Sequence, residues 1–214
     1  PADSSAGVIL YDDKFAYLID TDQQGPKAKT SLVSLSDARS AKGPMSSKNR
    51  SFTITRRHEL PNLKDVITSA IYNNAHEYLN PPITNISFKG IRKTAKVIGS
   101  WLERPGVTPE LITQVGTLME KAGTGGALFR NMYRDFLNEC NELYPELNLK
   151  NPYEKFCTIA EMWTEVSRLI CKAGENLSEL HLKEASHILM DIASLEEEAM
   201  KMLCENTLDF HNKS

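Results

Sequence analysis

Residues 63–78 read LKDVITSAIYNNAHEY, and they change the hydrophobic period of the chain. From Leu63 to Tyr78, most apolar side chains recur three or four residues apart, which places them on one face of a helix. Asn80-Pro81-Pro82 then ends that helix. The same spacing predicts further helices over residues 89–103, 109–122, 126–143, 153–173 and 178–208. The sequence therefore predicts a helical domain over residues 59–214.

A β-rich segment, residues 1–58, precedes the helical part. Two short apolar runs, Gly7–Tyr11 and Phe15–Ile19, flank the turn signal Asp12-Asp13 and predict a β-hairpin. Ser51–Thr55 alternates between polar and apolar residues and predicts a third strand. Because so few strands are marginal in water, the segment either packs on the helices or belongs to a sheet whose other strands lie elsewhere. The predicted fold class is α+β: a short antiparallel β segment of about three strands followed by a mostly helical bundle region.

The composition is that of an ordinary globular protein. Of the 214 residues, 41% are hydrophobic and 25% are charged, so the chain has enough apolar residues to form a core. A net charge of −3 argues against a chain that binds nucleic acid over its whole surface. No apolar run approaches the ~20 residues that cross a bilayer, and the first residues lack the order of a secretion signal. We therefore expect a cytoplasmic protein with no nucleic-acid or membrane partner.

The residue types that carry nucleophilic or metal chemistry are present but scattered. The cysteines, at positions 140, 157, 171 and 204, form no CxxC pair and lie in apolar helical repeats, which indicates buried, reduced thiols. No histidine is placed to complete a catalytic group with them. Glu184 and His187 have the E-x-x-H spacing of di-iron bundles, but the chain lacks the second E-x-x-H that such bundles need. We therefore predict no metal site.

The most distinctive stretch is EKAGTGGALFRNMYRDFLNEC, residues 120–140. Gly123 is suited to end one helix in a left-handed conformation, and Thr124 to cap the next. The two following glycines leave the first backbone N–H groups of that helix uncovered at its positive end. The pattern has two interpretations: a site for a carboxylate or phosphate, or a tight helix–helix corner at which glycine permits close approach. The first interpretation assigns anion binding to Gly123, Thr124, Gly125, Gly126, Arg130 and Arg134.

The helix after this corner carries an apolar stripe at helical spacing. Its members are Phe129, Met132, Tyr133, Phe136, Leu137 and Cys140. We predict that these side chains pack in the core of the bundle and do not form a cofactor site.

Four cations share one face of the helix predicted over residues 89–103, at the spacing i, i+3, i+4, i+7. Apolar residues take the opposite face. One interpretation is a solvated surface. The other is docking of an acidic partner, because complementary charge speeds association. The candidate docking residues are Lys89, Arg92, Lys93 and Lys96.

Three stretches of the sequence together resemble the C-terminal portion of butirosin-biosynthesis protein H-type proteins. They are residues 120–140, the pair Pro81-Pro82 followed by Lys89–Lys93, and Leu35–Arg39. The resemblance covers nearly the whole chain. Its most specific part is GTGG-x-x-x-R-x-x-Y, which adds Tyr133 to the candidate site.

The resemblance implies a helical domain that follows a cysteine-peptidase-like domain, of which residues 1–58 would be the end. It also implies an acyltransferase that moves an aminoacyl-type group to an amine of an aminoglycoside. The donor substrate would be the phosphopantetheine thioester of an acyl carrier protein, which is also the implied partner. No cofactor is expected in the chain itself.

Catalysis in such proteins begins when a cysteine attacks the thioester. A histidine opens one β-strand, and an aspartate closes the next. Only the aspartate can be mapped here, as Asp20, because no histidine lies near Asp3 or Ser4 and no upstream cysteine domain is present in the chain.

Three explanations stay open: a fragment, a cleaved or split subunit completed by another chain, or a protein that has lost the chemistry. We therefore expect the C-terminal part or a subunit of a thiol acyltransferase-like protein. The alternative is a non-catalytic helical interaction module that binds an acidic partner protein.

Overall fold

The computed structural model describes residues 7–19, 27–43, 46–52, 55, 59–121 and 126–211. The chain divides into two compact units, Pro1–His58 and Glu59–Ser214, at the position where the hydrophobic period of the sequence changes. The described strands and one helix lie in the first unit, and the second unit is helical. The α+β class predicted from the sequence is therefore confirmed.

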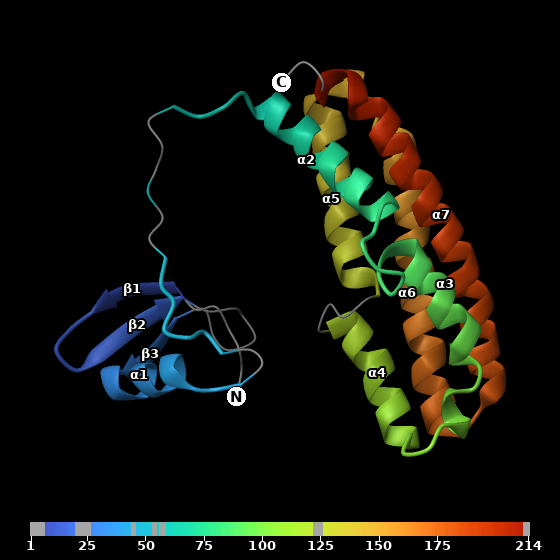
Figure 1. The fold of residues 1–214 in the computed structure, drawn as a ribbon, viewed down its shortest axis with the longest axis horizontal. Helices are drawn as coiled ribbons and strands as arrows, with labels where there is room; N and C mark the ends of the chain where they lie inside the picture. The colour runs from blue at the N-terminus through green and yellow to red at the C-terminus, as the bar shows by residue number, and fades with distance from the viewer. Residues whose placement is uncertain are drawn as a thin grey trace. The chain divides into compact units, whose positions relative to one another are not determined.

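The N-terminal unit contains a small antiparallel sheet (Figure 1). β1 (Gly7–Tyr11) pairs with β2 (Phe15–Ile19), which confirms the predicted hairpin. Asp12 holds the turn, because its Oδ1 accepts the backbone N–H of Lys14 at 2.8 Å and that of Phe15 at 2.7 Å. These two N–H groups favour the charged carboxylate and lower the pKa of Asp12 below its ordinary value.

The third strand of this sheet does not lie where the sequence pattern placed it. β3 (Ala28–Ser31) pairs antiparallel with β2, with Phe15 opposite Ser31. The prediction of a strand at 51–55 was wrong, since the described residues Ser51, Phe52 and Thr55 adopt no strand. Alternation shows only that a segment could be a strand, and in the order β1-β2-β3 the second partner of β2 is β3.

One helix, α1 (Leu32–Ser40), follows β3 directly and packs against β2 and β3. Its N-cap is Ser31, whose Oγ accepts the backbone N–H of Ser34 at 3.0 Å. The Leu35–Arg39 motif lies inside this helix.

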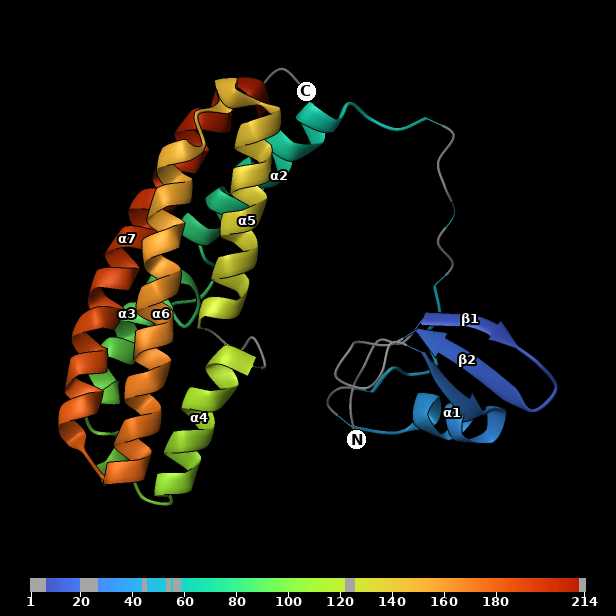
Figure 2. The same cartoon turned by 180° about the vertical axis from the view of Figure 1, so that it is seen from behind.

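The C-terminal unit is an antiparallel bundle whose described helices form four columns (Figures 1 and 2). α6 and α7 are each one long column. The other two columns are each broken into two helices placed end to end, α2 then α3 and α4 then α5. The helices are α2 (Leu63–Leu79), α3 (Ser87–Ile98), α4 (Pro109–Lys121), α5 (Ala127–Leu143), α6 (Lys150–Asn176) and α7 (Glu179–His211), with short 3-10 turns at Trp101–Glu103 and Pro145–Leu147.

The pairing of the columns places the core between them. α7 packs along α2 and α3, α6 packs along α4 and α5, and α6 packs against α7. The helices predicted from the hydrophobic period are confirmed, except that the helix expected over 89–103 ends at Ile98 and a separate 3-10 turn follows at Trp101–Glu103. Among the largest fully buried side chains are Ile71, Ile98, Leu137, Phe156, Ile170, Leu189 and Leu203.

The apolar stripe of α5 is only partly core, so the prediction was wrong for two of its members. Leu137 and Cys140 are buried and Tyr133 and Phe136 are half-buried, whereas Phe129 is 53% and Met132 is 59% exposed. The reason lies in the neighbours of α5. It packs along α6, but α2 in the next column does not pack closely against it, so no described helix covers this flank of the stripe.

α4 and α6 approach each other closely at two glycines. A Cβ atom on Gly174 would lie 2.3 Å from Oγ1 of Thr113 and 2.7 Å from its backbone nitrogen. A Cβ atom on Gly116 would lie 2.8 Å from the carbonyl oxygen of Ser167. The hydroxyl of Ser167 donates a hydrogen bond to the carbonyl of Gly116 at 2.8 Å. The column of α4 is therefore fixed against α6 by backbone contact, which side chains larger than hydrogen would prevent.

Replacing Gly174 by Ala should lower the free energy of unfolding by about 2 kcal/mol, because the new methyl group forces the two backbones apart. The control is Gly99→Ala. Gly99 has a helical φ of −58°, and its Cβ would meet only the Lys183 Cγ at 3.7 Å. Chemical denaturation should show Gly99→Ala unchanged or slightly more stable. Equal stability of the two variants would contradict the close approach.

Candidate functional site

Glu196 in α7 is the most deeply buried charged side chain of the described residues, with 1% exposure. Its Oε1 accepts hydrogen bonds from Nε of Arg130 at 2.9 Å and from Nε1 of Trp163 at 2.8 Å. Its Oε2 accepts from Nη2 of Arg130 at 3.2 Å and from the hydroxyl of Tyr78. These donors come from α5, α6 and α2, so one carboxylate joins four helices.

The donors are themselves held in place by aromatic contacts. The guanidinium of Arg130 lies over the ring of Trp163, 4.8 Å from its centre, an attractive cation–π geometry. The ring of Tyr78 lies beside Phe88, with 6.1 Å between the ring centres. Burial and the charge of Glu196 raise the pKa of Tyr78 far above its ordinary value, so its hydroxyl stays protonated and remains a donor.

This cluster, which we call the Glu196 cluster (Tyr78, Arg130, Trp163 and Glu196), is suited to holding the bundle together. Each oxygen of the carboxylate already accepts two hydrogen bonds, so it offers little to a ligand. A fully satisfied buried ion pair specifies how its helices are aligned. We therefore assign it a structural role.

Sequence reasoning missed Glu196, although one signal points to it. The buried face of α7 runs through Leu189, Ile192, Ala193, Ala199, Met200 and Leu203. Glu196 lies on the same face, four residues after Ile192 and seven before Leu203. A carboxylate at an apolar position of a helix predicts a buried partner, but the pattern does not say which residue supplies it.

The predicted anion site at the α4–α5 corner is described only in part, because Gly123, Thr124 and Gly125 lie outside the described residues. Gly126 caps α5 with φ of 75°, and a Cβ there would lie 2.3 Å from the carbonyl oxygen of Met119. The corner thus needs glycine, as the packing interpretation states. The first N–H of α5, on Ala127, points to Oε1 of Glu120 at 3.4 Å, so a carboxylate of the chain already lies at this helix end.

The two arginines of the predicted site have partners within the chain. Arg130 uses Nε and Nη2 for Glu196. Arg134 donates from Nε to Asp135 at 2.8 Å and from Nη1 to Asn131 at 2.6 Å. The hydrogen bond to Asp135 raises the pKa of Arg134 above its ordinary value.

Tyr133, the last residue of the motif, points into the bundle. Its ring meets Phe156 edge-on at 5.0 Å and stacks on Phe136 at 5.9 Å. Its hydroxyl is buried without a hydrogen-bond partner among the described residues. Burial raises the pKa of Tyr133 well above its ordinary value. The predicted catalytic Asp20 lies outside the described residues.

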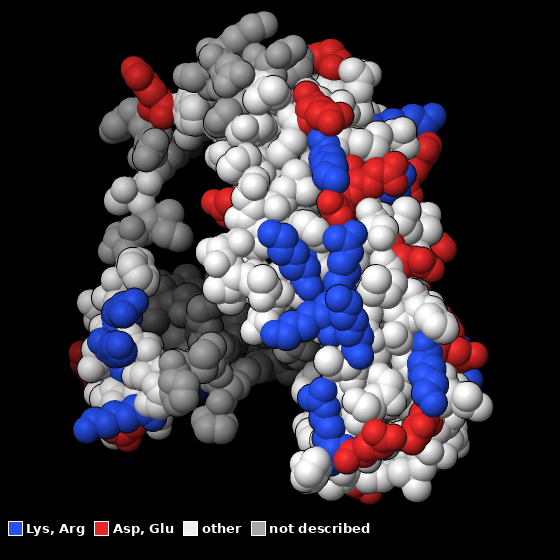
Figure 3. All heavy atoms as spheres, turned by 45° about the vertical axis from the view of Figure 1, so that its right-hand side comes forward, with Lys and Arg blue, Asp and Glu red and all other residues white. Residues whose placement is uncertain are grey.

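The predicted docking residues share one face of α3. Lys89, Lys93 and Lys96 are exposed and form no salt bridge with a carboxylate of the described residues. Lys93 donates to the side-chain amide oxygen of Asn85 at 2.7 Å. Arg92 is half-buried and pairs with Glu197 of α7 at 2.7 Å. Figure 3 shows Lys and Arg side chains gathered over this part of the helical unit. We call the four residues of α3 the basic face.

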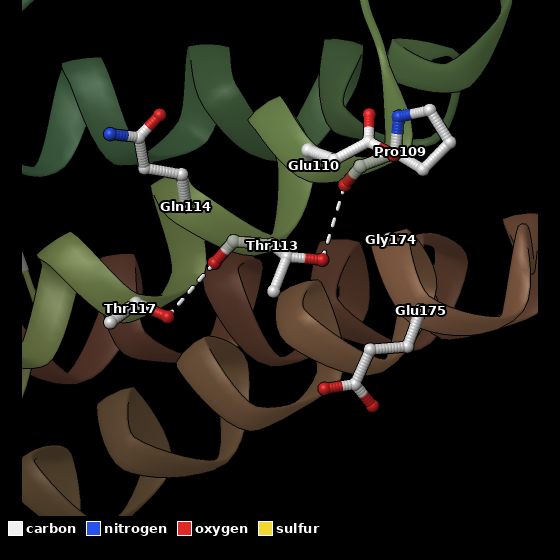
Figure 4. A pocket seen from close by; sticks show the side chains of 7 residues that line it. All are labelled: Pro109, Glu110, Thr113, Gln114, Thr117, Gly174 and Glu175. Atoms are coloured by element: carbon white, nitrogen blue, oxygen red, sulfur yellow. Dashed lines mark hydrogen bonds between the residues drawn. The ribbon is translucent and has the colours of Figure 1, made fainter.

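A shallow hollow of about 500 Å³ lies between α4 and α6 (Figure 4). The hydroxyl of Thr113 donates to the carbonyl of Pro109 at 3.1 Å, and that of Thr117 donates to the carbonyl of Thr113 at 3.0 Å. Both hydroxyls thus serve the helix backbone, and the hollow presents no activated nucleophile. Its lining is Pro109, Glu110, Thr113, Gln114, Thr117, Gly174 and Glu175.

The four cysteines are free thiols, of which Cys140 is buried and the other three are half-buried. Burial raises the pKa of Cys140 to about 11 and also raises that of Cys204, so these two thiols are poor nucleophiles at neutral pH. Within the described ranges, no three His, Cys, Asp or Glu side chains lie close enough to hold a metal ion. No described helix is both long and apolar enough to cross a membrane.

Arg130→Met should lower the free energy of unfolding by about 3 kcal/mol, because it leaves the buried carboxylate of Glu196 without its cation. Arg134→Met, one turn further along the same helix, is the matched control and should cost less than about 1 kcal/mol, since its partner Asp135 is 63% exposed. Urea denaturation of both variants measures the difference. A similar loss for both would show that the Glu196 cluster contributes no special stability.

Tyr78→Phe and Tyr133→Phe remove a hydroxyl from two half-buried tyrosines with opposite expected results. Tyr78→Phe should cost about 2 kcal/mol, because a hydrogen bond to a charged acceptor is lost. Tyr133→Phe should leave stability unchanged or raise it, because the hydroxyl that disappears has no partner among the described residues. Thermal unfolding compares the two. A larger loss for Tyr133→Phe would refute this assignment.

Comparison with known proteins places the chain in a family. No curated protein and no solved structure matches it. Residues 33–203, which include nearly all of α1 and of the helical unit, match the family described as a domain of unknown function, DUF4872. The chain therefore belongs to the DUF4872 family.

Proposed function

We propose that the helical unit docks an acidic carrier protein through the basic face of α3, as part of a thiol acyltransferase-like protein. The observation that carries the proposal is the exposure of Lys89, Lys93 and Lys96 on one helix face, without a carboxylate partner among the described residues. Cations that the protein leaves uncompensated attract an acidic partner and speed its association.

The charge of the rest of the chain favours a protein partner over nucleic acid. The chain as a whole carries a net charge of −3, so the basic face is a local exception. A long polyanion would meet carboxylates beyond that face, whereas an acidic helix or loop can match it alone. A carrier protein with an acidic surface fits this local pattern.

In this proposal the carrier presents an acyl or aminoacyl group on its phosphopantetheine thioester, and an amine accepts it. The resemblance to butirosin-biosynthesis protein H-type proteins supports that chemistry. The helical unit would contribute docking. The attacking thiol would come from another domain or chain. This agrees with the raised pKa of Cys140, because a thiol that is protonated at neutral pH is a poor nucleophile. Asp20 would orient the catalytic histidine, which another domain or chain would also supply.

The α4–α5 corner would hold an anionic group of the substrate in this proposal. Arg130 keeps its Nη1 for such a group, since only Nε and Nη2 bind Glu196. Arg134 is 30% exposed and could exchange Asp135 for a ligand carboxylate or phosphate. The remaining members of the predicted site are Gly123, Thr124, Gly125, Gly126 and Tyr133.

A non-catalytic interaction module is the second candidate, because the same basic face would serve it. The two candidates differ in what the carrier does after docking. Addition of an aminoacylated carrier and an amine to the purified chain should give no transfer in either case. Transfer by the chain alone would contradict the assignment of the thiol to another domain or chain.

Charge reversal at Lys89 and Lys93 tests the docking proposal. The double variant Lys89→Glu, Lys93→Glu should bind a phosphopantetheinylated acyl carrier protein at least about tenfold more weakly, with most of the loss in the association rate at low salt. Titration calorimetry and stopped-flow fluorescence measure the two quantities.

The control for this experiment is Lys150→Glu at the start of α6, where the lysine side chain is 77% exposed. It should leave carrier affinity within about twofold. Undiminished binding by the double variant would sink the docking proposal. If a single-stranded oligonucleotide bound as tightly as the carrier, and the lysine reversals weakened that binding, the partner would be a nucleic acid and the acidic-protein proposal would be wrong.

A further inference from the structure

Glu197 of α7 places a negative charge at the edge of the basic face. Its Oε2 lies 2.7 Å from Nη2 of Arg92, and its Oε1 lies 2.8 Å from Nζ of Lys201. The side chain of Glu197 is 21% exposed and that of Arg92 is 36% exposed. Each carboxylate oxygen is thus engaged by a cation, and the pair remains accessible from solvent.

Arg92 is the member of the basic face best suited to bind a carboxylate, and it is the member already engaged. Its planar guanidinium can bind a carboxylate through two parallel hydrogen bonds, which a lysine cannot do. Its side chain is also positioned in advance, because the guanidinium lies over the ring of buried Phe88 at 5.0 Å. Among the lysines, Nζ of Lys89 lies farther from the same ring, at 5.8 Å, and Lys93 donates to the side chain of Asn85.

The charge of Glu197 persists over the neutral pH range. Two hydrogen bonds, one from Lys201 and one from Arg92, lower the pKa of Glu197 below its ordinary value. Any acidic partner therefore approaches the lysines in the presence of a fixed negative charge. It can gain Arg92 only in exchange with Glu197.

We infer that Glu197 is an internal competitor that occupies Arg92 in the free protein and is displaced when an acidic partner binds the basic face. The inference rests on the proposed docking function and adds its regulation. The lysines would make the first contacts, because they are exposed and have no carboxylate partner among the described residues. Arg92 would then exchange the Glu197 carboxylate for one of the partner.

Glu197→Gln tests this exchange, since the amide keeps the size of the side chain and removes its charge. It should bind the phosphopantetheinylated acyl carrier protein about fivefold more tightly than the unchanged chain, the effect of one close unit charge at a surface. The matched control is Glu198→Gln, the same change one residue later. Glu198 is 58% exposed and pairs with Lys155 of α6 at 3.0 Å. The Glu198→Gln variant should bind the carrier with an affinity within about twofold of the unchanged chain.

A second variant shows whether the gain comes from Arg92. Arg92→Gln should weaken binding less in the unchanged chain than in the Glu197→Gln background, because in the unchanged chain the partner must first displace Glu197 from Arg92. In the Glu197→Gln background it should remove most of the gain. Such dependence of one substitution on the other identifies a direct coupling between the two residues. Thermal unfolding of each variant verifies that the helical unit remains folded, and the Arg92→Gln pair still decides the question if Glu197→Gln alone lowers stability.

The results separate this inference from the docking proposal. If the lysine reversals leave carrier binding intact, the docking proposal itself is wrong. If they weaken binding while Glu197→Gln and Glu198→Gln give equal affinities, docking stands and the competitor role of Glu197 is wrong. A gain in Glu197→Gln that survives Arg92→Gln would also overturn it, because the effect would then be general electrostatics.

Discussion

A buried carboxylate must find its hydrogen bonds and its countercharge within the protein, because an unmatched charge in a core costs several kcal/mol. In this chain that constraint falls on Glu196. Its two oxygens are satisfied only when donors from α2, α5 and α6 reach α7 at the same level of the bundle. Apolar packing alone would tolerate small shifts of one column along another. The Glu196 cluster adds a directional requirement to that packing, because its donors must reach one carboxylate from three helices.

The same turn of α7 serves the core and the surface. Successive residues of a helix point about 100° apart, so Glu196 faces the Glu196 cluster while Glu197 faces α3 and Arg92. The alignment that satisfies the buried carboxylate therefore also decides where the basic face meets α7. A surface whose charges are fixed by the core can keep its geometry without a large buried interface, which suits a docking function.

The fold could be predicted from the sequence wherever local rules decide it. The hydrophobic period predicted the helices of the columns, and the turn signal Asp12-Asp13 predicted the hairpin. The failures occurred where a neighbour decides the outcome. Residues 51–55 alternate like a strand, but the segment that pairs with the second strand of the hairpin is β3. Phe129 lies on the apolar stripe of α5, yet it is exposed because no described helix covers that flank.

The candidate sites show the same difference between features set by one helix and features set by contacts between helices. The spacing of the cations on α3 is a property of one helix, so the basic face was visible in the sequence. The engagement of Arg92 by Glu197 was not, because the two residues are separated by 105 positions. The partner of Arg130 was also not visible, because its Nε and Nη2 bind a carboxylate 66 residues away.

The sequence by itself determined which segments are helical, where the columns break, and that four cations lie on one side of α3. Each of these follows from steric and hydrophobic preferences that act within a few residues. Only the tertiary structure decided which of those charges are neutralised. Glu196 and Glu197 are adjacent in the sequence, yet one is buried by three helices and the other meets Arg92 at the surface. The electrostatic partner of a side chain depends on which columns lie side by side and at what level, and this information is not contained in the period of any single helix.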